Sequence, residues 1–334
     1  MDDEYIALAH GNGGRLMREL IGGVFARHLA YPLLDLATDA ARLPVEGGEI
    51  FMTTDAFTVQ PLEFPGGTIG SLAVHGTVND LAVSGALPRY LALNVLIEEG
   101  FAVAQLDRII ASLARAAQES GVRVVAGDTK VVRRGEASGL YLATTGVGFV
   151  PSGLALGLSH VRAGDAVLVS GPVGDHGMAV LLAREQFGLR GDLLSDAASV
   201  LPLTQAVLDL PGLRFMRDPT RGGLASVAHE ICQATGFGIE LDQTAIPVRE
   251  PVAAVCDMLG YDPYYLACEG RVVAVIDNGQ AEAALARWRD LPQGRDAALI
   301  GHVMTAPARV ALRTALGGSR LLEELEDDPL PRIC

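Results

Sequence analysis

The sequence has 334 residues, of which 49% are hydrophobic and 5% aromatic, and its formal net charge is −14 at pH 7. This length favours two domains, and the hydrophobic content is sufficient for sizeable cores. The acidic balance argues against a nucleic-acid surface and against docking on anionic lipid, because both depend on clustered Lys and Arg.

The first half of the chain alternates apolar runs with helical patterns. Apolar runs bounded by turn residues predict strands over residues 51–54, 91–97, 122–126 and 140–150. Apolar residues at helical spacing predict helices over residues 16–25, 72–83 and 106–117. The alternation, together with abundant glycine at the turns, predicts an α/β domain over residues 1–150.

Turn residues at 151–153 predict a domain boundary, and a second set of elements follows it. Strands are expected over residues 165–170, 238–241 and 271–276. Helices are expected after the turns at 174–177 and 220–223, and over 251–259 and 282–291. From Arg313 onward strand character is lost, so we predict a second domain over residues 151–313 and a flexible tail over 314–334.

A glycine-rich segment, His10-Gly11-Asn12-Gly13-Gly14-Arg15, precedes the first predicted helix. Glycine lets the backbone approach a ligand closely, and a helix N-terminus offers unpaired N–H groups that suit phosphate. The segment lacks the Gly-Lys-Ser/Thr ending of a P-loop, and it does not match the dinucleotide-binding pattern that follows a strand. A tight turn explains it equally well.

Three aspartates end apolar runs, and together they indicate a metal-nucleotide site. Asp55 and Asp128 are expected at strand ends, where open α/β sheets place their ligands, while Asp80 lies within or beside a helix. Each one alone would be read as a cap or a turn residue. Convergence of the three, with Lys130 close behind Asp128, favours a Mg²⁺ ion that bridges nucleotide phosphates.

The second half contributes two polar turns and one carboxylate just before a predicted strand. Two arginines of the segment 217–223 offer guanidinium forks, and 174–177 is a Gly-flanked polar turn. Glu269 precedes a strand and would serve as a general base if it is partly buried, although it also fits an ordinary turn.

The last residue of the sequence is Cys334, which follows Pro331-Arg332-Ile333. Two prolines and several carboxylates before it predict an extended, solvated stretch, so that the thiol could reach more than one active site. The tail alone favours an incidental cysteine, and it is the rest of the chain that reverses this preference.

The four cysteines indicate neither a zinc site nor a disulfide framework. They are Cys232, Cys256, Cys268 and Cys334. None forms a C-x-x-C pair, and a chain of this size does not depend on disulfides. The acidic first residues do not resemble a signal peptide, and no apolar run reaches membrane-spanning length. We therefore expect a soluble, cytoplasmic protein.

Taken in order, the motifs of this chain resemble HypE, the family of hydrogenase maturation proteins that make the cyanide ligands of [NiFe]-hydrogenase. The motifs are His10-Gly11-x-Gly13-Gly14, Phe64-Pro65-Gly66-Gly67, Asn79-Asp80-x-Ala82-Val83-Ser84-Gly85-Ala86, Gly127-Asp128-Thr129-Lys130-Val131-Val132, Gly174-Asp175-His176-Gly177, Arg217-Asp218-x-Thr220-Arg221-Gly222-Gly223 and Pro331-Arg332-Ile333-Cys334. The resemblance covers essentially the whole chain. The HypE family is in turn similar to aminoimidazole ribonucleotide synthetase, selenophosphate synthetase and thiamine-monophosphate kinase.

The resemblance implies a fold and a set of ligands. An N-terminal α/β domain would form a β-barrel across a homodimer, an α+β domain would follow, and ATP with Mg²⁺ would bind near the dimer interface. The implied cofactor-binding residues are Gly11, Asn12, Gly13, Gly14, Asp55, Asn79, Asp80, Asp128 and Thr129, with Asp55, Asp80 and Asp128 as metal ligands.

The resemblance also implies a reaction. A separate carbamoyltransferase would load Cys334 as a thiocarbamate, and ATP-dependent dehydration would convert this group to a thiocyanate. Cyanide would then pass to iron on a scaffold complex. Lys130 would stabilise the phosphoryl group or polarise the thiocarbamate, and Glu269 would accept a proton from its nitrogen. The family usually has Asn before this glutamate, whereas this chain has Cys268.

Two other functions compete with this reading. A selenophosphate synthetase would carry a reactive Cys near its N-terminal glycine-rich loop, but no Cys precedes Cys232 here. A non-catalytic scaffold could bind nucleotide and present its tail to a partner, although retention of Asp80, Asp128 and Lys130 argues against it. ATP hydrolysis that appears only when Cys334 is carbamoylated would distinguish the three.

Overall fold

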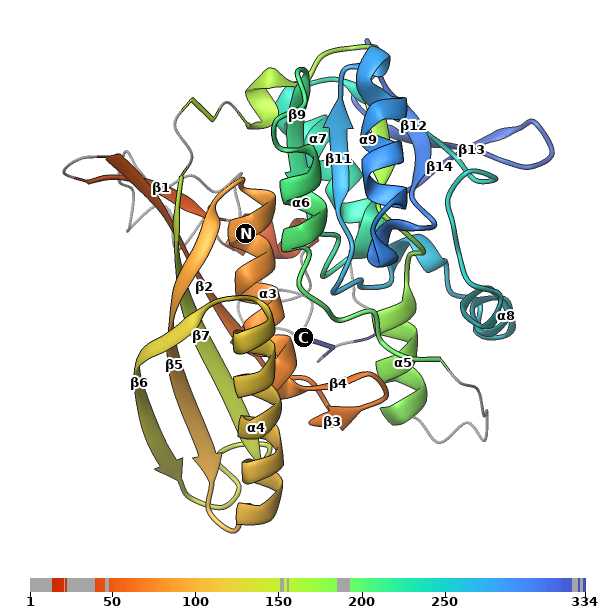
Figure 1. Ribbon diagram of the computed structural model, residues 1–334. Coiled ribbons are helices and arrows are strands. Elements are labelled where there is room, and N and C mark those ends of the chain that lie inside the picture. The colour runs from red at the N-terminus through yellow and green to blue at the C-terminus, as the bar shows by residue number, and fades with distance from the viewer. Residues whose placement is uncertain are drawn as a thin grey trace.

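The computed structural model describes residues 14–20, 22, 40–45, 48–150, 153–154, 156–184, 193–325, 330 and 333–334. These residues form two α/β units, each built on its own large sheet (Figure 1). Among the described residues, no helix is both long and apolar enough to span a membrane.

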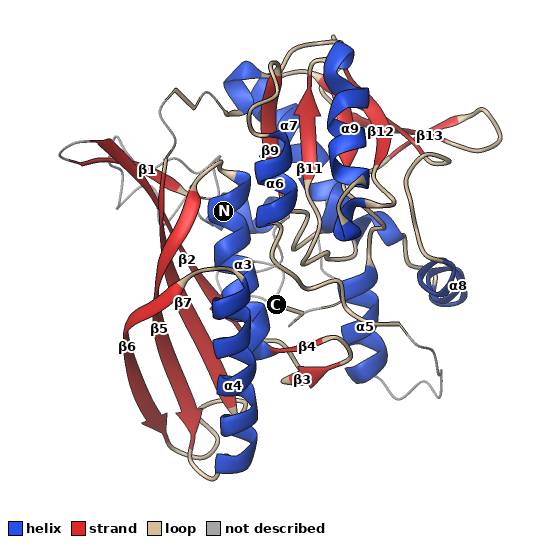
Figure 2. Cartoon of the chain, in the orientation of Figure 1, coloured by secondary structure: helices blue, strands red, loops and turns tan. Residues whose placement is uncertain are grey.

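The first unit contains a five-stranded sheet in the order β1-β2-β7-β5-β6. Only the β5–β6 pair is parallel, and the other neighbours are antiparallel. Helices α3 and α4 lie against one face of the sheet (Figure 2). The elements are α1 (Arg15–Leu20), β1 (Ala41–Val45), β2 (Gly48–Phe57), β3 (Glu63–Phe64), β4 (Gly67–Thr68), α3 (Ile69–Val83), β5 (Leu87–Glu98), α4 (Val103–Glu119), β6 (Arg123–Val132) and β7 (Leu140–Phe149).

Helix α3 is the centre of this unit and is buried along almost its whole length. Apolar residues occur all round it, as expected for a helix enclosed by the sheet, by α4 and by α6 (Leu201–Val207) of the second unit. Its start is fixed by a capping box in which Thr68 and Ser71 satisfy each other's backbone N–H groups. Polar residues on α3 are therefore held in fixed positions between the two units.

The second unit contains a seven-stranded sheet in the order β14-β13-β10-β12-β8-β11-β9. Strands β8 and β11 are buried at every residue, because α6 and α9 pack on one face and α7 on the other. The elements are η3 (Leu158–His160), β8 (Ala166–Val169), α5 (Asp175–Arg184), α6 (Leu201–Val207), β9 (Leu213–Arg217), α7 (Gly223–Thr235), β10 (Gly238–Asp242), α8 (Glu250–Leu259), η4 (Pro263–Tyr265), β11 (Val273–Ile276), η5 (Asn278–Gln280), α9 (Ala281–Arg289), η6 (Pro292–Gly294), β12 (Ala298–Met304), β13 (Val310–Arg313) and β14 (Ser319–Leu321).

Three features differ from the sequence-based expectations. Strands β2 and β6 are longer than predicted, so Asp55 and Asp128 lie within strands rather than after them. Strand β14 lies in the region that was expected to be tail, because it pairs with β13. The end of the chain was expected to be solvated, but Leu330 and Ile333 are buried, each with 2% of its surface exposed.

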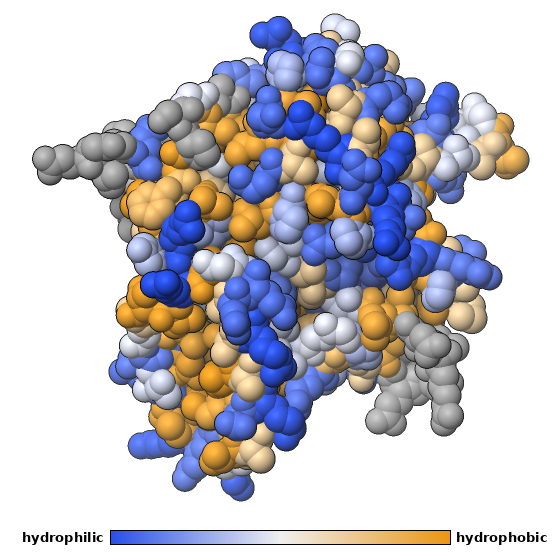
Figure 3. Space-filling view, in the orientation of Figure 1, coloured by the Kyte–Doolittle hydropathy of each residue, from blue (hydrophilic) through white to orange (hydrophobic). Residues whose placement is uncertain are grey.

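Strand β6 forms one open edge of the first sheet, and it exposes several valines together with charged residues. Val124, Val125 and Val131 expose 41%, 61% and 69% of their surface. Figure 3 shows apolar side chains gathered at the lower left of the molecule, where Figure 1 places β5 and β6. An exposed apolar edge strand is a template for pairing with another chain.

Candidate active site

Two of the predicted metal ligands, Asp55 and Asp80, meet where β2 crosses α3. Asp55 on β2 accepts a hydrogen bond from the Thr77 hydroxyl at 2.9 Å, and Asp80 on α3 accepts one from the Thr53 hydroxyl at 2.8 Å. Residues 53 and 55 share one face of a strand, and residues 77 and 80 share one face of a helix. The two pairs therefore lock both carboxylates into the same layer. Burial raises the pKa of Asp55, although the Thr77 hydrogen bond and the Arg221 charge oppose the rise.

A third carboxylate, Asp218, reaches this layer from the second unit. Burial raises its pKa to about 6, opposed by Arg217 and reinforced by the charge of Asp55. Its Oδ2 atom has no hydrogen-bond partner among the described residues. In the sequence the segment 217–223 stood out for its arginines, and Asp218 was not predicted as a site residue; the available signal was its position directly after a strand.

Glu269 lies in the same acidic region and is almost fully buried, with 1% of its surface exposed. Burial raises its pKa well above the usual range, and the charges of Asp218 and Asp196 raise it further. Its Oε1 atom finds no hydrogen-bond partner among the described residues. The backbone of Glu269 is fixed, since its N–H donates to Asp196 Oδ1 at 3.1 Å.

Asn79 joins the two units beside this cluster. Its Nδ2 donates to the carbonyls of Ala198 and Glu269 at 3.0 and 3.1 Å, and its Oδ1 accepts from the Val200 N–H at 2.8 Å. The amide was expected to contact a nucleotide, but both of its donors are engaged by the second unit. We therefore regard Asn79 as the residue that fixes the position of Glu269 relative to α3.

Asp128, Thr129 and Lys130 lie away from the cluster within one chain. Strand pairing aligns Asp55 with Thr144, Thr144 with Leu93 and Leu93 with Gly127. Three strand spacings separate β2 from β6, about 14 Å. The Asp55 side chain faces α3, and Gly127 is aligned with Asp55 across the sheet, so Gly127 lies on the face toward α3. Neighbouring residues of a strand alternate between faces, so Asp128 lies on the opposite face, and so does Lys130.

Exposure agrees with this placement. The side chains of Lys130 and Asp128 are 74% and 65% exposed and form an ion pair of 4.0 Å with each other. Among the described residues, no group of three or more His, Cys, Asp or Glu side chains is already arranged to hold a metal ion. The expected triad of Asp55, Asp80 and Asp128 is thus not brought together within one chain. The carboxylate that lies near Asp55 and Asp80 is Asp218, but these three also do not form a ready-made metal site among the described residues.

Of the glycine-rich segment, Gly11, Asn12 and Gly13 lie outside the described residues, and Gly14 is the first residue before α1. The N–H of Arg15 donates to the carbonyl of Leu325 at 3.4 Å. A Cβ atom placed on Gly222 would lie 3.6 Å from the Leu325 side chain. The described end of this segment therefore lies close to the Arg217–Gly223 turn that carries Asp218.

The last two residues of the sequence dock between the two units. The backbone oxygen of Cys334 accepts hydrogen bonds from the N–H and hydroxyl of Thr58, at 3.0 and 3.2 Å. Thr58 follows β2 directly, three residues beyond Asp55. The carbonyl of Ile333 lies 2.6 Å from Nε2 of His176 at the start of α5. Figure 1 shows the C-terminal end in the space between α3 and α5.

Cys268, the departure from the family pattern, has a structural role. Its sulfur accepts a hydrogen bond from the N–H of Gly174 at 3.2 Å and is fully buried. Burial raises the pKa of this thiol well above its usual value, with a further contribution from Asp196. A buried neutral thiol is a poor nucleophile, so Cys268 does not compete with Cys334.

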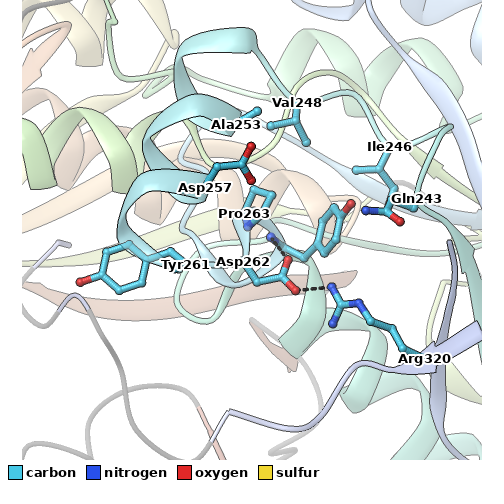
Figure 4. A pocket seen from close by; sticks show the side chains of 12 residues that line it. Gln243, Ile246, Val248, Ala253, Asp257, Tyr261, Asp262, Pro263 and Arg320 are labelled. Atoms are coloured by element: carbon cyan, nitrogen blue, oxygen red, sulfur yellow. Dashed lines mark hydrogen bonds and ion pairs between the residues drawn. The ribbon is translucent and has the colours of Figure 1, made fainter. Parts of the chain in front are cut away.

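A separate cavity of about 590 Å³ lies between α8 and β14 (Figure 4). Its mouth carries an ion pair between Asp262 and Arg320, and Asp262 also accepts a hydrogen bond from the N–H of Tyr264 at 3.3 Å. None of the predicted site residues lines it. The carboxylate cluster, rather than this cavity, is the candidate active site.

Comparison with known proteins identifies the family of this chain. Residues 37–150 match the N-terminal domain, and residues 162–312 the C-terminal domain, of AIR synthase related proteins. A carbamoyl dehydratase HypE from Azotobacter vinelandii is 48% identical over 331 residues, which cover 98% of this chain and 97% of that protein.

Solved structures are equally similar. A chain in the crystal structure of a HypE-HypF complex is 42% identical with a TM-score of 0.87, covering 92% of this chain and 99% of that chain. A HypE structure in complex with ATP is 43% identical with a TM-score of 0.83, covering 99% of this chain and 100% of that chain. The chain therefore belongs to the HypE family of carbamoyl dehydratases, within the AIR synthase related proteins.

Proposed function

We propose that this chain uses ATP to dehydrate a thiocarbamate carried on its own Cys334, and that the resulting thiocyanate supplies cyanide to the iron of a [NiFe]-hydrogenase. As a member of the HypE family, the chain is an ATP-dependent carbamoyl dehydratase of hydrogenase maturation. The observation that carries the Cys334 assignment is its docking at Thr58, three residues beyond Asp55.

The carboxylate cluster fits Mg²⁺. A hard divalent cation prefers carboxylate oxygens, and Asp218 Oδ2 is buried with no hydrogen-bond partner among the described residues. We propose that Asp55, Asp80 and Asp218 would hold Mg²⁺, which would neutralise charge on the nucleotide phosphates. The raised pKa values of Asp55 and Asp218 support this, because both are raised mainly by burial and a bound cation would offset the cost of burying the two charges.

The reaction balances as thiocarbamate plus ATP giving thiocyanate, ADP and phosphate. The carbonyl oxygen of the thiocarbamate attacks the γ-phosphorus of ATP, which turns a poor leaving group into phosphate. Loss of the nitrogen protons then expels phosphate and forms the carbon–nitrogen triple bond. We assign the proton acceptor as Glu269, since its buried carboxylate would be a strong base when ionised.

A homodimer would bring β6 into the site region. We infer that two copies pair through their exposed β6 edges, forming the barrel that the resemblance implies. The exposed Val125 and Val131 support this pairing. In such a dimer Asp128, Thr129 and Lys130 would lie at the subunit interface, and Lys130 would contact phosphate only from there.

The partners follow from the chemistry of each step. Cys334 must be loaded before dehydration, so a carbamoyltransferase must reach it, and the HypE-HypF complex supports such a partner. An iron-carrying scaffold would then accept cyanide from the thiocyanate. The four cysteines are all free, which fits a reducing compartment such as the cytoplasm.

The decisive experiment is intact mass spectrometry in two stages. The protein is first incubated with the carbamoyltransferase, carbamoyl phosphate and ATP, and the loaded form is then given Mg-ATP. We expect a carbamoyl adduct on Cys334 that loses the mass of one water in the second stage, and no adduct in Cys334→Ala. An adduct that never loses water would support a scaffold instead of a dehydratase.

A further inference from the structure

His176 is a fully buried histidine with a hydrogen bond at each ring nitrogen. Nε2 lies 2.6 Å from the Ile333 carbonyl and Nδ1 lies 2.8 Å from the Ser195 hydroxyl. Burial lowers the pKa of His176, so the ring is neutral and has one donor and one acceptor. A carbonyl can only accept, so Nε2 carries the proton and Nδ1 accepts from Ser195. The surroundings thus fix one tautomer, with its N–H directed at the tail.

Thr58 holds the next backbone oxygen from the opposite side. Its N–H and its hydroxyl both donate to Cys334, at 3.0 and 3.2 Å. Thr58 belongs to the first unit and His176 to the second, so the tail is gripped between them. All three hydrogen bonds use only backbone oxygens of the tail. None depends on the group attached to the Cys334 sulfur, so the same contacts suit the thiol, the thiocarbamate and the thiocyanate.

The segment that carries Ser195 also fixes Glu269. Asp196, the next residue, accepts from the Glu269 N–H at 3.1 Å, and the N–H of Ala198 donates to the Glu269 carbonyl at 3.3 Å. The N–H of Ser195 donates in turn to the Pro65 carbonyl at 2.9 Å in the first unit. Hydrogen bonds therefore connect the tail to His176 and Ser195, and the adjoining residues Asp196 and Ala198 of the same segment bond the backbone of Glu269.

We propose that His176 and Thr58 form a latch that positions the tail for dehydration, with His176 as the main positioning residue. This inference rests on the proposed dehydration at Cys334. The latch is closed during dehydration and open during loading, because the transferase needs the tail outside the molecule. Weakening it should impair dehydration while sparing or accelerating loading, a split that a general loss of stability would not produce.

The test compares His176→Leu, His176→Gln and Thr58→Val in the full-length protein. Leu removes the donor and leaves the Ile333 carbonyl unpaired, and we expect the single-turnover rate of dehydration to fall about tenfold or more. Gln retains an N–H near the position of Nε2 and should restore much of the rate. Thr58→Val removes only the hydroxyl donor. It should also slow dehydration without slowing loading, but the fall in the dehydration rate should be smaller.

A second readout does not require dehydration. We expect Cys334 in the unloaded protein to react faster with iodoacetamide in His176→Leu than in the wild type, with the alkylated residue identified by peptide mapping. His229→Leu is the matched control, because His229 Nε2 bonds a backbone carbonyl farther up the tail, that of Leu322, at 2.8 Å. It should leave the ratio of dehydration to loading unchanged.

The outcomes separate the latch from the proposed function. If wild-type protein loads but is never dehydrated, the proposed function fails, while alkylation still tests the latch. The latch is overturned if folded His176→Leu dehydrates at the wild-type rate, or if its Cys334 is alkylated at the wild-type rate. If His176→Leu does not fold, the Thr58→Val variant is the test. The latch is then refuted if the rates of loading and dehydration change by the same factor in Thr58→Val.

Discussion

Replacing Asp218 with Asn should stabilise the protein while abolishing its activity. The pKa of the Asp218 carboxyl is about 6 in the folded protein, against 3.8 as its ordinary value, and burial is the main cause. The folded state therefore binds this proton more tightly than the unfolded state does. The free energy of unfolding therefore falls as pH rises from about 4 to 6 and the carboxyl loses its proton. Above pH 6 the folded protein holds a buried charge, and the full destabilisation by that charge remains.

The size of the effect follows from the two pKa values. A difference of about 2 pKa units corresponds to about 3 kcal/mol at pH 8, and integration over the titration gives about 1.6 kcal/mol at pH 5. Asn has the same shape without the charge, so Asp218→Asn should raise the free energy of unfolding by up to these amounts.

Urea denaturation at pH 5 and pH 8, without nucleotide, would measure both values. Asp209→Asn is the control, because Asp209 is 73% exposed in its ion pair with Arg287 and its removal should not stabilise the protein. Mg-ATP should raise the unfolding midpoint of the wild type but not of Asp218→Asn. An Asp218→Asn protein that is less stable than wild type at pH 8 would refute the account of Asp218 as a destabilising metal ligand.

Three further predictions follow from the site and the open sheet edge. Glu269→Gln should still be loaded at Cys334 but should lose dehydration by about 10²- to 10⁴-fold, measured by intact mass; near-normal dehydration would exclude Glu269 as the base. Asn79→Ala removes three buried hydrogen bonds and should lower the free energy of unfolding by about 2–4 kcal/mol in urea, whereas a change below about 0.5 kcal/mol would contradict the bridging role. Val125→Lys should dissociate the proposed homodimer in sedimentation velocity, with the exposed Leu316→Lys as control, and a dimer that persists would place the interface elsewhere.

Part of the cluster was predictable because two of its carboxylates each stand out from their own neighbours in sequence. Asp55 and Asp80 were identified by their apolar surroundings, and the structure brings them together through Thr53 and Thr77. Asp128 has the same surroundings, but its distance from Asp55 depends on strand order. A sequence pattern does not reveal that β7 and β5 lie between β2 and β6.

Other features depend on contacts between distant segments. Asp218 joins the cluster only because the second unit packs against α3, and its neighbours Arg217 and Arg221 masked it as part of a basic turn. The tail was expected in solvent from its charge and prolines. Its docking depends on Thr58 and His176, which the composition of the tail cannot disclose.

The position of Leu325 sets a limit on how far Cys334 can travel. The carbonyl of Leu325 is held by the N–H of Arg15, and Leu322 is held by Val310 and His229. Nine residues from 326 to 334 can span about 30 Å at full extension. The thiocarbamate proposed on Cys334 would be attached to its enzyme by a short arm, so its encounter with the site would be set by the length of this arm and would not vary with protein concentration. Any enzyme that loads Cys334 must bring its own catalytic centre within this radius of Leu325.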